Sequence, residues 1–91
     1  MAVTRKVTLL NKYGLHQRPA MKVIEAANRF KSAVALIRDD RRCNAKSIID
    51  VIMLAAEKGT ELVVEAVGED EEAAASALVD LFANKFFLNE E

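Results

Sequence analysis

The sequence predicts an α+β domain in which helices cover one face of a small, mostly antiparallel sheet. Two observations predict it. Short segments rich in β-branched residues alternate with segments whose apolar residues recur every three or four positions, so strands and helices are interleaved over 91 residues. Their order is strand, helix, strand, strand, helix, strand, helix. A chain of this length builds one core, so we expect a single domain over residues 1–91.

The first half of the chain supplies four of these elements. Residues 3–10 alternate and contain Val and Thr, which predicts a strand with one solvated face. Residues 17–30 form a helix with one apolar stripe, which comprises Ala20, Val23, Ile24, Ala27 and Phe30. Residues 33–38 form a strand, and Asp39-Asp40 turns it into a short strand near residues 41–44.

The second half supplies the other three. Residues 47–56 form a short helix that Ser47 or Asn44 caps, and Gly59 follows it as a stop signal. Residues 60–67 form the fourth strand. Residues 70–85 form the last helix, because acidic residues stand at its start, where the helix dipole favours them. Its expected buried stripe comprises Ala74, Ala77, Leu78, Leu81 and Phe82.

The composition argues against several classes of protein. The chain is 52% hydrophobic and 30% charged, and its formal net charge is −1, which is typical of a soluble globular domain and does not favour nucleic-acid binding. No apolar run reaches the roughly 18 residues of a membrane span, so we expect no membrane insertion. Cys43 and His16 are the only residues of their types. We therefore expect no internal disulfide, no metal, no cofactor and a cytoplasmic location.

The stretch GLHQRPA, residues 14–20, holds the candidate site. Pro19 marks the first turn of a helix, where its missing N–H breaks no intrahelical hydrogen bond. The residue before a proline avoids the helical region, so Arg18 is itself a candidate for the cap. In either case His16 lies at a helix N-terminus, on the loop side, where backbone N–H groups and the helix dipole favour an anion. Arg18 adds a guanidinium suited to phosphate oxygens. These residues alone leave two interpretations open: a phosphoryl group carried on the imidazole, or an ordinary loop histidine.

The sequence resembles the histidine-containing phosphocarrier (HPr) family of the phosphoenolpyruvate-dependent sugar phosphotransferase system. GLHQRPA is similar to the family's active-site signature, KSIIDVIMLA (residues 46–55) to its regulatory-serine helix, and residues 59–82 to its last strand and helix. The resemblance implies an open-faced β-sandwich of βαββαβα order, with a four-stranded antiparallel sheet covered on one face by three helices. It also implies that His16 accepts a phosphoryl group at its δ nitrogen, and that Arg18 stabilises the phosphate.

The resemblance also implies the partners. Phospho-enzyme I would supply the phosphoryl group, and a IIA domain of a sugar permease would receive it. The implied partner-binding residues are Gln17, Ala20, Met21, Ile48, Ile49 and Ile52. Gln17 departs from the family, which usually has a small residue there; it would hydrogen-bond the phosphate or a partner, or be solvated, and we favour the last. The helical period places Val51, Leu54 and Ala55 on a buried side, and Ile49, Ile52 and Met53 elsewhere.

Ser47 has two compatible roles. As an N-cap it contributes about 1 kcal/mol. The resemblance implies regulatory phosphorylation by a serine kinase/phosphorylase, which a helix N-terminus tolerates.

The leading hypothesis is a phosphocarrier, not an enzyme, because enzyme I and the IIA domain complete each transfer site. We expect a monomer. One alternative is a carrier of the nitrogen-related branch of the system, with a regulatory role rather than sugar transport. Others are a regulatory binding module that acts through Ser47, and a structural domain with a vestigial site.

Overall fold

The computed structural model describes residues 2–88. The elements follow the predicted order, with one short 3₁₀ turn added after the last helix. They are β1 (Ala2–Thr8), α1 (Gln17–Ala27), β2 (Ala33–Arg38), β3 (Arg41–Asn44), α2 (Ile48–Met53), β4 (Glu61–Val67), α3 (Glu71–Ala83) and η1 (Lys85–Phe87). The strands form one antiparallel sheet in the order β1-β4-β2-β3, so β1 and β3 are its outer strands.

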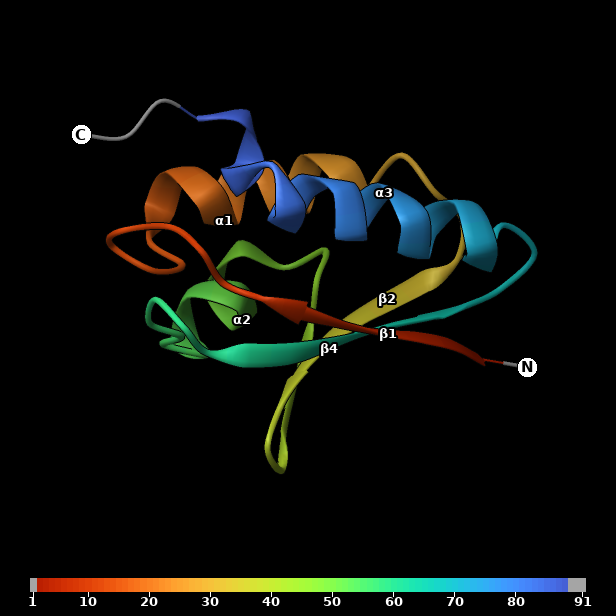
Figure 1. The fold of residues 1–91 in the computed structure, drawn as a ribbon. Coiled ribbons are helices and arrows are strands. Elements are labelled where there is room, and N and C mark those ends of the chain that lie inside the picture. Colours follow the sequence, from red (N-terminus) through yellow and green to blue (C-terminus); the bar gives the residue numbers. More distant parts are fainter. Residues whose placement is uncertain (1, 89–91) are drawn as a thin grey trace.

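The helices gather on one face of this sheet. Helices α1 and α3 lie side by side across it, and α2 packs near the start of α1 at one end (Figure 1). The other face is open, which confirms the predicted open-faced α+β architecture. The core lies between the layers, because alternate residues of the central strand point inward. Leu62, Val64 and Ala66 of β4 are fully buried, and they lie under Val23 of α1 and Leu78 of α3 in the same apolar cluster.

Several element ends differ from the sequence prediction. β1 ends at Thr8 rather than at residue 10. Helix α1 ends at Ala27 rather than at residue 30, because the chain tightens: Phe30 N–H donates to the carbonyl of Ala27, three residues back, at 3.2 Å. Helix α2 ends at Met53 rather than at residue 56, because Ala55 turns into the left-handed region with a φ of 53°. Both ends of β2 and β3, the start of α1 and the end of β4 match the prediction, and the remaining ends differ by one or two residues, as helix and strand ends commonly do.

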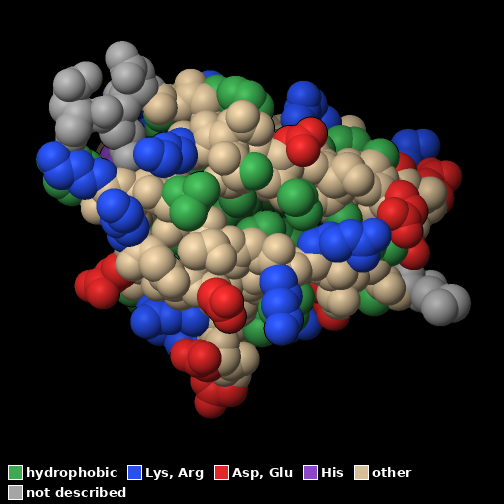
Figure 2. All heavy atoms as spheres, viewed as in Figure 1, with side chains coloured by type: hydrophobic (Ala, Val, Ile, Leu, Met, Phe, Trp, Pro, Cys, Tyr) green, Lys and Arg blue, Asp and Glu red, His purple; other side chains and the backbone are tan. Residues whose placement is uncertain are grey.

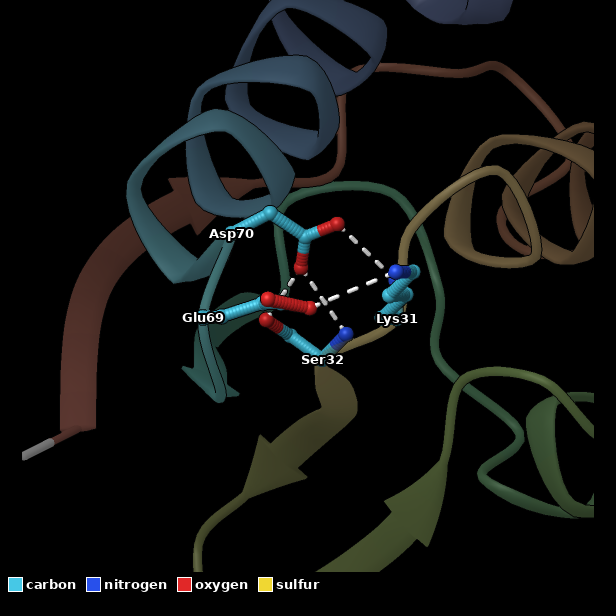
Figure 3. Close-up of polar contacts among 4 residues, drawn as sticks. All are labelled: Lys31, Ser32, Glu69 and Asp70. Atoms are coloured by element: carbon cyan, nitrogen blue, oxygen red, sulfur yellow. Dashed lines mark hydrogen bonds and ion pairs between the residues drawn. The ribbon is translucent and has the colours of Figure 1, made fainter.

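Asp70 joins the end of α1 to the start of α3. It stands at the N-cap of α3, but its carboxylate turns away from that helix (Figure 3). Its Oδ2 accepts a hydrogen bond from Lys31 N–H at 2.9 Å, and its Oδ1 accepts one from Ser32 N–H at 2.9 Å and another from the Ser32 hydroxyl. Lys31 also pairs with Glu69 at 3.4 Å. The connection from α1 to β2 is thereby fixed against α3.

These hydrogen bonds favour the charged form of the carboxylate. The Ser32 hydroxyl makes the largest contribution and the Lys31 N–H the next, and together with the Ser32 N–H they lower the pKa of Asp70 to about 2. The ordinary value is 3.8. Because the pKa is lower in the folded state, this group stabilises the fold above about pH 4, and that stabilisation is lost as the pH falls towards about 2.

We expect Asp70→Asn to lower the free energy of unfolding at neutral pH and to lose this effect in acid. The amide cannot provide the charged acceptor that Ser32 and Lys31 bind. Urea titrations of both proteins, from neutral pH down to about pH 2.5, measure the difference. It should shrink between about pH 4 and about pH 2. Glu69→Gln is the control, since its carboxylate is largely exposed. A difference that stays constant over the whole range would contradict this account.

Candidate functional site

The loop between β1 and α1 places His16 at the N-cap of α1. Its backbone is extended, with φ −83° and ψ −167°, and its carbonyl accepts a hydrogen bond from Ala20 N–H at 3.0 Å. The helix therefore begins at Gln17, and Pro19 lies in its first turn, as the sequence predicts. The imidazole does not cap the helix. The N–H groups of Gln17 and Arg18, which have no intrahelical acceptor, are left for an anion beside the ring.

Arg18 follows within the same first turn. Its side chain is exposed, and within residues 2–88 its guanidinium has neither a hydrogen bond nor an ion pair. No internal bond has to break for it to bind phosphate oxygens. Gln17 beside it is also exposed, as expected of a solvated residue at a helix start.

Charge is unevenly distributed around this site. Lys and Arg side chains gather at the end of the molecule where α1 begins, and Asp and Glu side chains are more frequent around the start of α3 (Figure 2). A surface rich in cations attracts anionic ligands in general.

Tyr13 is a site residue that the sequence analysis did not single out. Its ring meets the His16 ring edge to face, with the centroids 6.1 Å apart and the planes at 81°. The Lys12 ammonium lies 5.2 Å from the centroid of the Tyr13 ring, whose side chain is 66% exposed. An aromatic residue directly before Gly-Leu-His was the available signal, but the sequence does not show which way a loop side chain turns. The Tyr13 ring therefore packs edge to face against the imidazole.

Gly14 lets the histidine loop approach the segment that follows α2. Its φ is +71°, and a Cβ atom there would lie 2.5 Å from the carbonyl oxygen of Ala56. The next residue, Leu15, donates its N–H to that same oxygen at 3.0 Å. A side chain at position 14 would push the two segments apart. The place of His16 relative to α2 is therefore set by a backbone contact.

Ser47 is the N-cap of α2, one of the two candidates that the sequence offered. Its Oγ accepts a hydrogen bond from Asp50 N–H at 3.4 Å, which is long, and its carbonyl accepts one from Val51 N–H at 3.1 Å. Asn44 closes the preceding turn instead, where its Oδ1 accepts from Lys46 N–H at 2.9 Å. The Ser47 side chain is half-buried at the edge of the helix.

Helix α2 exposes three large apolar residues. Ile49, Ile52 and Met53, here called the α2 patch, are 68%, 42% and 62% exposed. Val51 and Leu54 face the core on the opposite side, as the period predicts. The expectation that Ala55 is buried with them is wrong: it is exposed, because the chain has already left the helix.

The other implied partner-binding residues lie at different depths. Met21 is exposed, and Ile48 is half-buried against the core. Ala20 is fully buried in the core, so its side chain contributes packing beneath α1. Met21 is therefore the one of these three whose side chain is available at the surface.

Two negative observations apply to the described part of the chain. Residues 2–88 bring together no group of three or more side chains that would hold a metal ion, and they contain no helix long and apolar enough to span a membrane.

Cys43 is buried in β3, and this burial raises the pKa of its thiol. It therefore has little thiolate and little reactivity near neutral pH.

Comparison with known proteins identifies relatives over almost the whole chain. The family model described as "PTS HPr component phosphorylation site" matches residues 3–84. The phosphocarrier protein HPr of Treponema pallidum is 49% identical over 84 residues, which are 92% of this chain and 96% of that protein. The phosphocarrier protein NPr of Escherichia coli is 40% identical over 87 residues, which are 94% of this chain and 97% of that one.

A third relative, HPr of Thermoanaerobacter tengcongensis, has solved structures of the same fold. The crystal structure of its HPr-C-His form has a TM-score of 0.91 and 36% identity, and the alignment covers 97% of this chain and 99% of that one. The crystal structure of its HPr dimer has a TM-score of 0.75 and 40% identity, and covers 88% and 92%.

Proposed function

The chain belongs to the HPr family of phosphocarriers of the phosphotransferase system, and we propose that it takes a phosphoryl group from phospho-enzyme I onto His16 and passes it to IIA domains of sugar permeases. One observation supports this most directly: the sole histidine stands at the N-cap of α1, beside an exposed guanidinium that no described residue binds. Helix N-terminus, imidazole and arginine together supply what a phosphorylated histidine needs.

The proposed transfer is an in-line displacement at phosphorus. Nε2 of His16 is buried, which favours Nδ1 as the ring nitrogen that a donor reaches. The Nδ1 lone pair forms a bond to phosphorus while the bond from phosphorus to the donor breaks. Negative charge spreads over the three other phosphoryl oxygens in the transition state. The N–H groups of the first turn and the Arg18 guanidinium stabilise this charge. In the second transfer, a nucleophile of the acceptor forms a bond to phosphorus while the bond between phosphorus and Nδ1 of His16 breaks.

The carrier supplies only part of each transfer site. His16 is half-buried at the end of the loop before α1, and we propose that enzyme I or a IIA domain completes the transfer site around it. This division is why we propose a carrier that is modified and discharged, rather than an enzyme. The α2 patch, Met21 and Gln17 are the proposed docking surface beside His16. We propose a working monomer, because this surface must be free to bind two partners in turn.

A nitrogen-related regulatory chain is the second candidate function. The observation that favours it is the 40% identity to E. coli NPr over 94% of this chain. The site chemistry is the same in either case, and the difference lies in which enzyme I is the donor. Parallel assays with an enzyme I of each branch separate the two candidates. A module that acts only through Ser47 is less well supported, because it would not need His16 and Arg18 in this arrangement.

We expect His16→Ala to abolish phosphorylation by enzyme I and to leave the fold intact. The protein is incubated with phosphoenolpyruvate and enzyme I, and its intact mass is measured. The wild-type chain should gain one phosphoryl group that acid removes, as a phosphoramidate requires. Cys43→Ser is the control and should behave as wild type, since that thiol is buried. A His16→Ala protein that still gains the group would refute the proposal.

We expect Arg18→Ala to slow the transfer without unfolding the domain. The exposed side chain contributes no internal hydrogen bond among residues 2–88, so its loss costs little stability. One hydrogen bond to a charged group contributes roughly 1.5–3 kcal/mol, so the transfer rate should fall by about one to two decades. Rapid-quench kinetics measure the rate, and thermal unfolding is the control. A wild-type rate, or a collapsed unfolding transition, would contradict the role given to Arg18.

We further propose that phosphorylation of Ser47 regulates docking. A dianionic phosphate at the edge of the α2 patch would oppose burial of that patch against a partner and repel acidic groups on it. We expect Ser47→Asp to raise the half-saturating concentration for enzyme I-dependent phosphorylation while the melting temperature stays near wild type. Ser47→Ala should keep the transfer and lose at most about 1 kcal/mol of stability, because the capping hydrogen bond is long. Unchanged half-saturation in Ser47→Asp would place Ser47 outside the docking surface.

A further inference from the structure

Two arginines outside the site bind the carbonyl groups at the end of α2. Arg38 Nη1 donates to the carbonyls of Leu54 at 3.0 Å and Ala55 at 3.1 Å. Arg41 Nη2 donates to the carbonyl of Met53 at 3.0 Å. Arg38 ends β2 and Arg41 begins β3, and the two residues pair across the turn of the β2–β3 hairpin, which projects from the sheet (Figure 1). The hairpin therefore supplies the C-terminal cap of α2.

Helix α2 depends on this cap. It has six residues, fewer than a helix needs to be stable by its own hydrogen bonds. The chain leaves it through Ala55 at a φ of 53°, a conformation that glycine normally adopts at this position. Neither helix length nor residue type favours this ending. The two guanidinium groups favour it, because they bind the unpaired carbonyls and place positive charge at the negative end of the helix.

The capped segment also holds the histidine loop. Ala56, the next residue, accepts the hydrogen bond from Leu15 N–H, and Gly14 packs against the same carbonyl. Residues 54–56 thus contact Arg38 through the first two carbonyls and the histidine loop through the third. A shift of this segment would move the α2 patch and the approach to His16 relative to each other.

We propose that Arg38 and Arg41 are positioning residues for phosphoryl transfer. They fix the α2 patch and the His16 loop in one relative arrangement, so that a partner engages both surfaces at once. This inference rests on the proposed function, since it assumes that partners dock on the α2 patch. It assigns a role in partner binding to a hairpin that contributes no residue to the site itself.

Arg42 provides a matched control. It stands next to Arg41 in β3, but its guanidinium pairs with Glu65 of β4 instead of with α2. Arg42→Ala removes the same charge from the same strand and leaves the cap of α2 in place. A change seen in Arg38→Ala and Arg41→Ala, and not in Arg42→Ala, therefore reports the cap rather than net charge.

The first measurement is the steady-state kinetics of phosphorylation by enzyme I. Loss of hydrogen bonds to a charged donor should raise KM by roughly tenfold in Arg38→Ala and in Arg41→Ala. The kcat should change by less than about twofold, because His16 and Arg18 are untouched. Arg38→Lys should return KM towards wild type, since an ammonium group also donates to the Leu54 and Ala55 carbonyls. Arg42→Ala should match wild type.

The second measurement is hydrogen exchange in the carrier alone. We expect the amides of Leu15 and Ala55 to exchange faster in Arg38→Ala, while amides that pair β1 with β4 keep wild-type protection. Unchanged exchange at Leu15 and Ala55 would overturn the inference, whatever the kinetics show.

Ile49→Ser separates this inference from the proposed function. If Ile49→Ser raises KM and the two arginine variants do not, the docking surface stands and the positioning role is refuted. If Ile49→Ser leaves KM unchanged, the proposed docking surface is wrong. The positioning role of Arg38 and Arg41 is then refuted as well, because it assumes that surface.

Discussion

The hydrogen bond from Leu15 N–H to the Ala56 carbonyl is the contact on which the rest of the site depends. It joins two connections that are far apart in sequence, the loop that carries His16 and the segment that leaves α2. Only glycine fits beside it, because a Cβ atom on Gly14 would lie 2.5 Å from the shared oxygen. Since backbone atoms make this contact, the place of the loop does not depend on its exposed side chains, such as those of Lys12, Tyr13 and Gln17.

The site combines rigid and exposed parts. The backbone of His16 is fixed as the N-cap of α1, and Pro19 and Ala20 are buried in the first turn that follows it. The groups that would bind phosphate, the first-turn N–H groups and the Arg18 guanidinium, face outward. A phosphoryl group there would be stabilised in the free carrier without being enclosed. The same exposure leaves it open to attack by an acceptor, which is what a carrier between two partners requires.

Local signals explain why much of this was predictable from sequence. Pro19 marked the start of α1, Ser47 marked the start of α2, and Asp39-Asp40 marked the hairpin, since caps and turns depend on neighbouring residues. The end of α2 was not predictable. Alanine favours helix, and the left-handed Ala55 is explained by Arg38, which contacts it from another element.

The C-terminal turn escaped prediction for a similar reason. Phe86 adopts a φ of 61°, is fully buried, and packs its ring 4.8 Å from that of Phe82. The Asn11 side chain donates to the carbonyl of Lys85 at 3.2 Å. The edge-to-face contact of Tyr13 with His16 is likewise set by loop geometry. Each depends on contacts between distant segments, which no local pattern records.

An open-faced sheet also has two unpaired edges, and both outer strands of this sheet carry positively charged residues. The outer strand β1 carries Arg5 and Lys6, and the outer strand β3 carries Arg41 and Arg42. Two copies that tried to extend one another's sheet would bring these cations together while their backbones lost water. Cations on outer strands oppose such pairing in general, and here Arg5 and Arg42 also form ion pairs with Glu72 and Glu65. Arg41 thus places a charge on an outer strand of the sheet and donates a hydrogen bond to the end of α2.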